Sequence, residues 1–233
     1  MLVRRIYAVA VTAITLLLTA CGGGGGGSAG PVSSTETFQL RAGWVNYITD
    51  TRSLPFTLTG SVSGTAVTGS GTLTQGSLSS AVFESQNALK KTSVVTGSIS
   101  GSGQTFPLGI TTTTYVDSNY TPLGSSGAEY AVYSSGNAIP LTARVNDTGI
   151  WYQSVRYTSS SKTSRLGTAT ASYVLEPDTA STALLKIVNV EKDTYGTTTS
   201  TQTLTFRITP TGGLTRLSEV GSEGNTALTL SYQ

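Results

Sequence analysis

The sequence predicts an all-β protein, an antiparallel meander of about a dozen strands that forms a sandwich, a barrel or a half-barrel. From Pro55 onward, apolar residues alternate with polar ones almost everywhere, which is the pattern of strands with one buried face. Clusters of Gly, Ser, Asn and Pro interrupt this alternation about every 8 to 12 residues, as in antiparallel sandwiches and barrels. The polar positions are mostly Thr and Ser, which suit a half-solvated pleated surface, so we expect a soluble domain rather than a membrane barrel.

The segment before Pro55 fits two kinds of secondary structure. Between residues 38 and 48, the apolar side chains fall at helical spacing, but several of them also alternate as in a strand. We expect one short N-terminal helix here, opened by Ser34 or Thr35, although Trp, Val, Tyr and Ile together favour strands.

The strands are expected in hairpins. The predicted segments are 56–62 and 67–73 around a turn at 63–65, 95–99 and 106–110 around a turn at 100–103, 141–145 and 151–157 around a turn at 146–149, then 169–175, 184–190, 204–208 and, after a turn at 210–213, 228–232.

The composition excludes several classes of protein. Only 11% of the residues are charged, there is one Cys, and there is no His. Coiled coils, nucleic-acid binders and disulfide scaffolds need charge or Cys that this chain lacks. Without His there is no Ser-His or Cys-His pair and no imidazole metal site. We therefore expect no enzymatic activity, no catalytic residue, no cofactor and no metal site.

The first residues have the features of a secretory signal. Arg4 and Arg5 form a basic start, residues 6–18 are almost entirely apolar, and small residues precede Cys21. Leu18-Thr19-Ala20-Cys21 resembles the bacterial lipobox, which implies cleavage before Cys21 and lipidation of that residue. Removal of residues 1–20 would leave 12 basic and 12 acidic residues, because two of the 14 basic residues lie in the signal.

The rest of the chain divides into a linker and a folded body. Residues 21–36 contain the lipidated Cys and a Gly/Ser-rich stretch without apolar periodicity, which is typical of a flexible tether. Residues 37–233 form the β domain. A division into two sub-domains near residues 136–140 is left open.

Two short motifs match catalytic patterns, but turn chemistry explains both better. Asp147-Thr148-Gly149 matches the loop of aspartic proteases, which need two such carboxylates, and the chain has one copy. Ser159 and Lys162 have the nucleophile spacing of penicillin-recognising enzymes, but they lie in a polar stretch without a helix signal. We interpret both as loops.

Charged pairs and tyrosines are the remaining candidates. We interpret Lys90-Lys91 as a solvated turn, and we interpret three acidic pairs as solvated turn carboxylates rather than cation ligands. These pairs are Glu176 with Asp178, Glu191 with Asp193, and Glu219 with Glu223. The tyrosines crowded into the middle of the chain could stack on sugars or rim an apolar groove, but cross-strand pairing is favoured. They are Tyr115, Tyr120, Tyr130, Tyr133, Tyr152, Tyr157 and Tyr173.

The whole chain resembles the uncharacterised Gly-run lipoproteins of betaproteobacteria. The resemblance rests on the Gly run after Cys21, the Ser/Thr/Gly-rich body, and two stretches, residues 115–124 (YVDSNYTPLG) and 173–180 (YVLEPDTA). It implies a lipid-anchored location and a high sheet content. It implies no activity.

We therefore expect an outer-membrane lipoprotein, facing the periplasm or displayed on the cell surface, with a non-enzymatic binding or structural role in the cell envelope. Its partners would be the membrane, through the lipid anchor, and an envelope protein, a glycan or an apolar ligand, but no nucleic acid. The alternative is a carrier of an acyl chain or other apolar ligand in a half-open barrel. Both roles need only strands with an apolar face, so the sequence does not choose between them.

Overall fold

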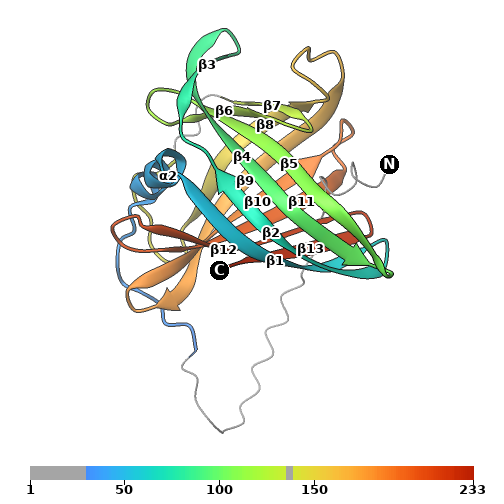
Figure 1. Ribbon diagram of the computed structural model, residues 1–233. Helices are drawn as coiled ribbons and strands as arrows, with labels where there is room; N and C mark the ends of the chain where they lie inside the picture. The colour runs from blue at the N-terminus through green and yellow to red at the C-terminus, as the bar shows by residue number, and fades with distance from the viewer. Residues whose placement is uncertain (1–29, 135–138) are drawn as a thin grey trace, which may run out of the picture.

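Within the residues that the structure describes, thirteen antiparallel strands and one short helix form the fold (Figure 1). A computed structural model describes residues 30–134 and 139–233, so the predicted signal peptide and Cys21 lie outside the described residues. In chain order the elements are α2 (Leu40–Thr49), β1 (Arg52–Val62), β2 (Thr65–Gln75), β3 (Ser79–Phe83), β4 (Gln86–Gly101), β5 (Gln104–Val116), β6 (Pro122–Ser126), β7 (Tyr130–Tyr133), β8 (Thr148–Tyr157), β9 (Arg165–Thr179), β10 (Thr182–Lys192), β11 (Thr198–Ile208), β12 (Leu214–Glu223) and β13 (Thr226–Tyr232). The expected all-β meander with one N-terminal helix is confirmed.

The sheet closes on itself as a barrel of twelve strands. Successive strands pair with each other except β2 and β3, β13 returns to β1, and β2 pairs with β4 from Val67 opposite Gly101 to Gln75 opposite Ser93. β3 lies outside the ring and pairs with the end of β4 that extends beyond β2. Closure satisfies the backbone groups that an open edge would leave unpaired. The sequence left a sandwich, a barrel and a half-barrel open, and the structure shows the closed barrel.

Two tight hairpins agree with the sequence prediction. Ser63 and Gly64 have φ values of 51° and 81°, and Ser102 and Gly103 have φ values of 50° and 75°. A two-residue turn with both central residues in the left-handed region matches the twist of the strands that it connects. The second turn is shorter than the expected 100–103, because β4 continues to Gly101.

Glycine lets the strands around the closure approach closely. A Cβ atom on Gly71 of β2 would collide with the carbonyl oxygen of Thr96 on β4, and it would also meet the ring of Phe56. Phe56 lies directly opposite Gly71 in the register of β1 and β2. The aromatic ring therefore occupies the space that the absent side chain leaves.

The helix is present where it was expected, but its predicted start was wrong. α2 begins after Gln39, which makes no side-chain capping bond, rather than at Ser34 or Thr35. The Ser34 hydroxyl instead donates to the carbonyl of Ala180 at 2.8 Å and accepts from the Glu36 amide at 3.2 Å. Ser34 therefore attaches the segment before the helix to the β9–β10 turn.

The predicted strand 141–145 is also wrong. This stretch makes one isolated bridge, in which Ala143 pairs with Phe38, and Leu141 is 70% exposed. It does not join the barrel but contacts α2 and the segment before it: Ala143 exchanges two backbone bonds with Phe38, and the carbonyl of Leu141 accepts from the Arg41 amide at 3.4 Å. The prediction missed β3, β6, β7 and β12, which are short or carry charged residues at inward positions.

Strands on both sides of residues 135–138 belong to the same sheet. β7 and β8 pair directly, with Tyr130 opposite Tyr157. No helix within the described residues is long and apolar enough to cross a membrane.

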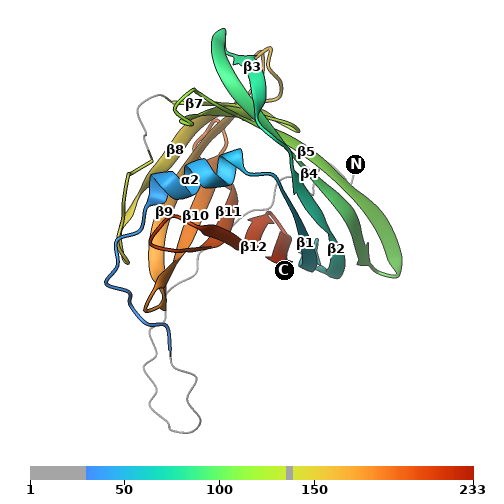
Figure 2. The same cartoon turned by 60° about the vertical axis from the view of Figure 1, so that its left-hand side comes forward.

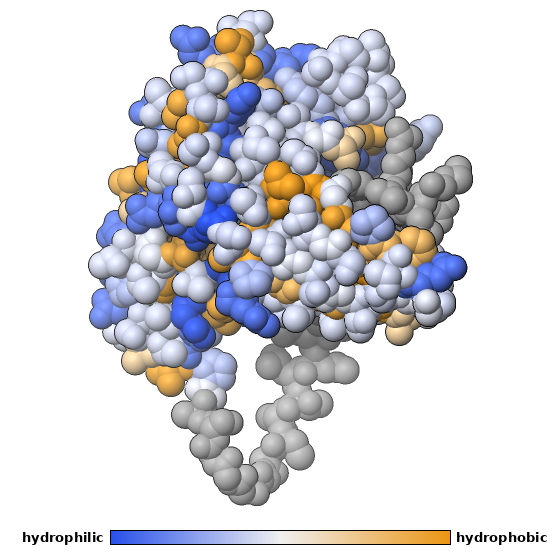
Figure 3. Space-filling view, viewed as in Figure 1, coloured by the Kyte–Doolittle hydropathy of each residue, from blue (hydrophilic) through white to orange (hydrophobic). Residues whose placement is uncertain are grey.

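The barrel has two main apolar clusters, one on each half. The first packs α2 against β8 to β11 and includes Phe38, Leu40, Trp151, Leu185 and Phe206. The second joins β1, β2, β4, β5 and β13. α2 lies across one end of the barrel, between β1 and the strands β8 to β10 (Figure 2). The outer face over β1, β2, β4 and β5 is mostly pale in Figure 3, as expected for Ser, Thr and Gly.

Candidate functional site

The interior of the barrel contains a cavity of about 500 Å³. Side chains from α2 and from all twelve barrel strands line it. Thr112 of β5 is exposed although it lines this cavity, so the interior is wide enough around it to admit solvent. Cavities of about 300 to 1,000 Å³ are typical of small-molecule sites.

One side of the cavity is apolar, and we call it the aliphatic wall. Its side chains come from neighbouring strands of the half that closes through β2 and β4. They are Phe56 and Leu58 of β1, Leu73 of β2, Val95 of β4, Leu108 and Ile110 of β5, and Leu228 and Leu230 of β13. The sequence alternation placed these residues on the buried face of their strands, and burial of such a surface stabilises the barrel.

The other side carries polar residues among apolar ones such as Trp151, Ile187 and Phe206, and we call its polar residues the charged wall. It is formed by Arg156 of β8, Asn189 and Glu191 of β10, Gln202 of β11, Arg216 and Glu219 of β12, and Glu129 from the β6–β7 turn. Glu219 lies opposite Leu230, and Leu230 lies opposite Leu58 in the register. The two walls therefore meet between β12 and β13.

Arg156 sits between two carboxylates. Its Nε and Nη2 donate to the two oxygens of Glu129 at 2.9 Å each, and Nη2 also lies 2.8 Å from Oε2 of Glu191. The Arg156 side chain is 9% exposed and that of Glu191 is 19% exposed. Burial raises the pKa of Glu191, and the charge of Arg156 opposes this effect only in part. Arg156 and Glu191 are therefore largely desolvated inside the barrel, whereas the Glu129 side chain is 37% exposed.

A second network joins the charged wall to the helix. Arg216 Nη2 forms an ion pair with Glu219, and Nη1 donates to the Tyr47 hydroxyl at 3.1 Å. Gln75 Nε2 donates to the same hydroxyl at 2.9 Å, and the Tyr232 hydroxyl donates to Glu219 at 3.2 Å. Burial by itself would lower the pKa of Arg216, but Glu219 and the tyrosines hold it above its usual value.

Lys91 fixes the C-terminal end of α2. Its ammonium group donates to the carbonyls of Tyr47 and Ile48 at 3.1 Å each, and it also contacts the carbonyl of Asp50. These carbonyls have no partner within the helix, and a cation stabilises the negative end of the helix dipole. Burial, with repulsion from Arg52, lowers the pKa of Lys91 to about 8. The interpretation of Lys90-Lys91 as a solvated turn was wrong, because both lie within β4 and Lys91 is 1% exposed.

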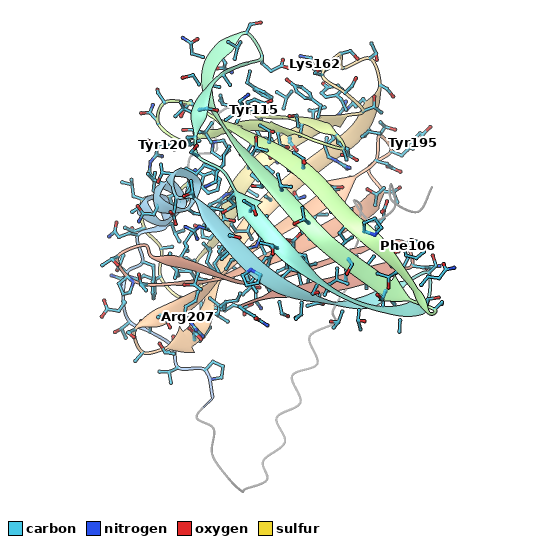
Figure 4. The ribbon with its side chains drawn as sticks, in the orientation of Figure 1. Phe106, Tyr115, Tyr120, Lys162, Tyr195 and Arg207 are labelled. Carbon is cyan, nitrogen blue, oxygen red and sulfur yellow. The ribbon has the colours of Figure 1, made fainter. Side chains whose placement is uncertain are left out.

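Other contacts hold α2 against the barrel. The Trp44 indole donates to the carbonyl of Tyr120 at 2.7 Å, and Arg41 donates to the carbonyl of Asn119 at 3.0 Å. Figure 4 shows Tyr120 on the side of α2, while Phe106 and Tyr195 lie on the opposite side of the barrel. The helix is therefore attached at both its middle and its C-terminal end, so it covers one end of the barrel in a fixed position.

The tyrosines mostly pair with other aromatic rings. Tyr133 and Tyr152 stack with their centroids 4.2 Å apart and an interplanar angle of 2°, and both face the cavity. Burial raises the pKa of both hydroxyls. Tyr115 and Tyr130 each stack on Phe83 of β3. Aromatic pairing within the sheet is therefore confirmed for these residues.

Asp147 follows a turn and Thr148-Gly149 begin β8, while Ser159 and Lys162 lie between β8 and β9. The Asp147 carboxylate accepts a bond from the Arg144 amide at 2.8 Å. Lys162 forms an ion pair with Glu84, while the Ser159 hydroxyl bonds to that of Ser161 at 2.8 Å. Neither arrangement brings a nucleophile to a base.

The acidic pairs do not act as units. Asp178 and Glu176 form ion pairs with Arg207 and Lys186, and Asp193 accepts amides of its own loop. Glu191 and Glu219 line the cavity, so their interpretation as solvated turn carboxylates was wrong. Among residues 30–134 and 139–233, no three His, Cys, Asp or Glu residues are grouped as metal ligands would be.

Sequence reasoning missed most of the charged wall. The signal that could have placed Arg156, Gln202 and Arg216 in the interior is their position in the alternation, because each stands where its strand turns a side chain inward. No protein-family model, no curated protein and no solved structure matches this chain.

Proposed function

We propose that this chain is a lipid-anchored protein of the bacterial cell envelope that carries a small apolar molecule inside its barrel. The observation that supports a carrier is the cavity of about 500 Å³, which has an apolar wall and is lined by every strand of the barrel. A barrel that served only as a scaffold would gain stability from filling this space, since each unfilled volume costs packing energy.

The arrangement of the interior favours binding over chemistry. Arg156, Arg216 and Lys91 are engaged with carboxylates or helix carbonyls, so they act in holding the barrel and α2 together. The proposal therefore assigns no reaction to the chain. The ligand would enter from the barrel end opposite α2, because several bonds hold the helix in place.

The cavity can be tested with a pair of neighbouring substitutions on β5. Thr112 lines the cavity, whereas the side chain of Thr111 is exposed and is not part of its lining. Thr112→Trp should fill the interior, and Thr111→Trp is the matched control. We expect native mass spectrometry of the full-length protein, released from bacterial membranes, to show a bound small molecule for the wild type and for Thr111→Trp, and to lose it for Thr112→Trp. A wild type without a bound mass, or the same bound mass in all three proteins, would contradict the carrier.

The lipid anchor is tested separately. Cys21→Ser should abolish acylation, because the thiol that takes the lipid is then absent. The intact mass of the two proteins checks this: the wild type should carry a lipid mass on a chain that begins at residue 21, and Cys21→Ser should lack it. A lipid mass that persists in Cys21→Ser would contradict anchoring at this residue.

A further inference from the structure

The charges that line the cavity cancel. Within the described residues, three cationic and three anionic side chains belong to the lining: Lys91, Arg156 and Arg216, and Glu129, Glu191 and Glu219. A ligand with its own formal charge would therefore enter the cavity without a matching counter-charge. Burying an unpaired charge is strongly unfavourable.

Each of these cations already has partners. Arg156 is shared by Glu129 and Glu191, Arg216 pairs with Glu219, and Lys91 bonds to the carbonyls of α2. A ligand carboxylate would have to displace a carboxylate of the protein to reach a guanidinium. A ligand ammonium would likewise compete with an arginine that is already bonded in two directions.

Neutral hydrogen-bonding groups also face the cavity. Ser93, Thr112 and Thr114 line it from β4 and β5, and Ser125 and Gln202 line it from β6 and β11. Hydroxyl and amide groups both donate and accept, so they suit an uncharged polar head group. Ser93 and Thr112 lie opposite each other on β4 and β5, two residues along from Val95 and Ile110 of the aliphatic wall.

We propose that the ligand is an uncharged amphiphile, whose alkyl chain lies along the aliphatic wall and whose hydroxyl, ester or amide head group lies against the polar side of the cavity. This inference rests on the proposed carrier function, and it excludes the free fatty acid that an acyl carrier would otherwise be expected to hold. The inference of an uncharged amphiphile rests on two observations: the charges of the lining sum to zero, and the aliphatic wall and the charged wall are contiguous.

The test compares three probes that share one alkyl chain. Lauroylglycerol is neutral, dodecanoate is anionic and dodecylammonium is cationic. Their affinities for the full-length protein in nanodiscs are measured below the critical micelle concentrations, with Thr112→Trp in the same nanodiscs to subtract partition into lipid. We expect lauroylglycerol to bind about tenfold or more tightly than either charged probe, a ratio that corresponds to about 1.4 kcal/mol.

Two substitutions should change this preference in opposite directions. Glu219→Gln removes the carboxylate beside Arg216, so binding of dodecanoate should improve relative to lauroylglycerol. Arg216→Met leaves Glu219 unpaired, so binding of dodecylammonium should improve instead. Asp178→Asn is the control, because Asp178 forms its ion pair with Arg207 away from the cavity lining, and it should leave the order of the probes unchanged.

The outcomes separate the two proposals. Tighter binding of dodecanoate or dodecylammonium to the wild type, lost in Thr112→Trp, would overturn the uncharged ligand and leave the carrier standing. An unchanged preference in both Glu219→Gln and Arg216→Met would also overturn it, since the charge balance would then not set the specificity. Equal binding of all three probes to the wild type and to Thr112→Trp would overturn the carrier itself.

Discussion

The two halves of the barrel differ in the side chains that they turn toward the cavity. Around β1, β2, β4, β5 and β13 most of the lining residues are apolar, whereas around β8 to β12 two ion networks lie among apolar residues such as Trp151, Ile187 and Phe206. The difference shows that period-two alternation builds the ring of strands, while the choice of inward residues sets what the ring can hold.

The largest expected effect is on the charged half. Arg156→Leu should lower the free energy of unfolding by about 2 to 4 kcal/mol, because it leaves two carboxylates facing each other without their cation. Urea unfolding of the full-length protein measures this. Arg207→Leu breaks an ion pair whose arginine is 47% exposed, and it should cost less than about 1 kcal/mol. Equal losses for the two variants would contradict the distinction between interior and surface ion pairs.

The attachment of α2 should contribute next. Lys91→Met removes the bonds to the last helix carbonyls and should cost about 2 to 3 kcal/mol, since hydrogen bonds to charged groups are among the stronger ones. Lys90→Met changes the adjacent exposed residue of the same strand and should be nearly neutral. Hydrogen exchange of residues 45–50 would show whether the helix end opens in the Lys91 variant. Unchanged protection there would contradict the conclusion that Lys91 holds the C-terminal end of α2.

The aliphatic half can be tested through its glycines. Gly71→Ala should destabilise the protein by about 1 to 3 kcal/mol, because its Cβ would collide with the carbonyl of Thr96 and with the Phe56 ring. Gly109→Ala is the matched control, since no atom lies within 4 Å of the position of its Cβ. A thermal melt of both variants is sufficient. Equal melting temperatures for the two variants would show that β2 and β4 can move apart without loss of stability.

The smallest expected effect concerns pH and Glu191. Its pKa is raised above 4.5 in the folded state, so the folded protein holds this proton to higher pH than the unfolded chain does. The stability that it contributes is complete below 4.5 and is lost as the pH rises through the folded pKa. The wild type should therefore lose stability relative to Glu191→Gln between acidic and neutral pH. An increase in this interval would contradict a raised pKa.

The local pattern was sufficient for the strands with regular alternation. The segments 56–62 and 67–73 lie within β1 and β2, and the turn at Ser63-Gly64 has the geometry that its residues favour. The same rule failed at 141–145, where alternating residues contact the segment before α2. It also missed β12, in which Arg216 and Glu219 stand at inward positions.

The candidate site was less predictable than the strands. Leu58, Leu108 and Leu228 are inward by alternation and were expected to be buried. A charged residue in the same pattern indicates a solvated surface, because an isolated buried charge is unfavourable. Glu191 and Arg156 lie about 35 residues apart in the chain, so nothing local shows that they pair.

The sequence by itself determined the antiparallel all-β class, the turns at the Gly-containing hairpins and the short N-terminal helix, because these depend on residues close together in the chain. Only the tertiary structure decided that β2 pairs with β4, that Lys91 holds α2, and that Arg156 meets Glu129 and Glu191 inside the barrel. These features depend on pairs of residues far apart in the chain, whose charges are stable in the interior only when closure of the barrel brings them together.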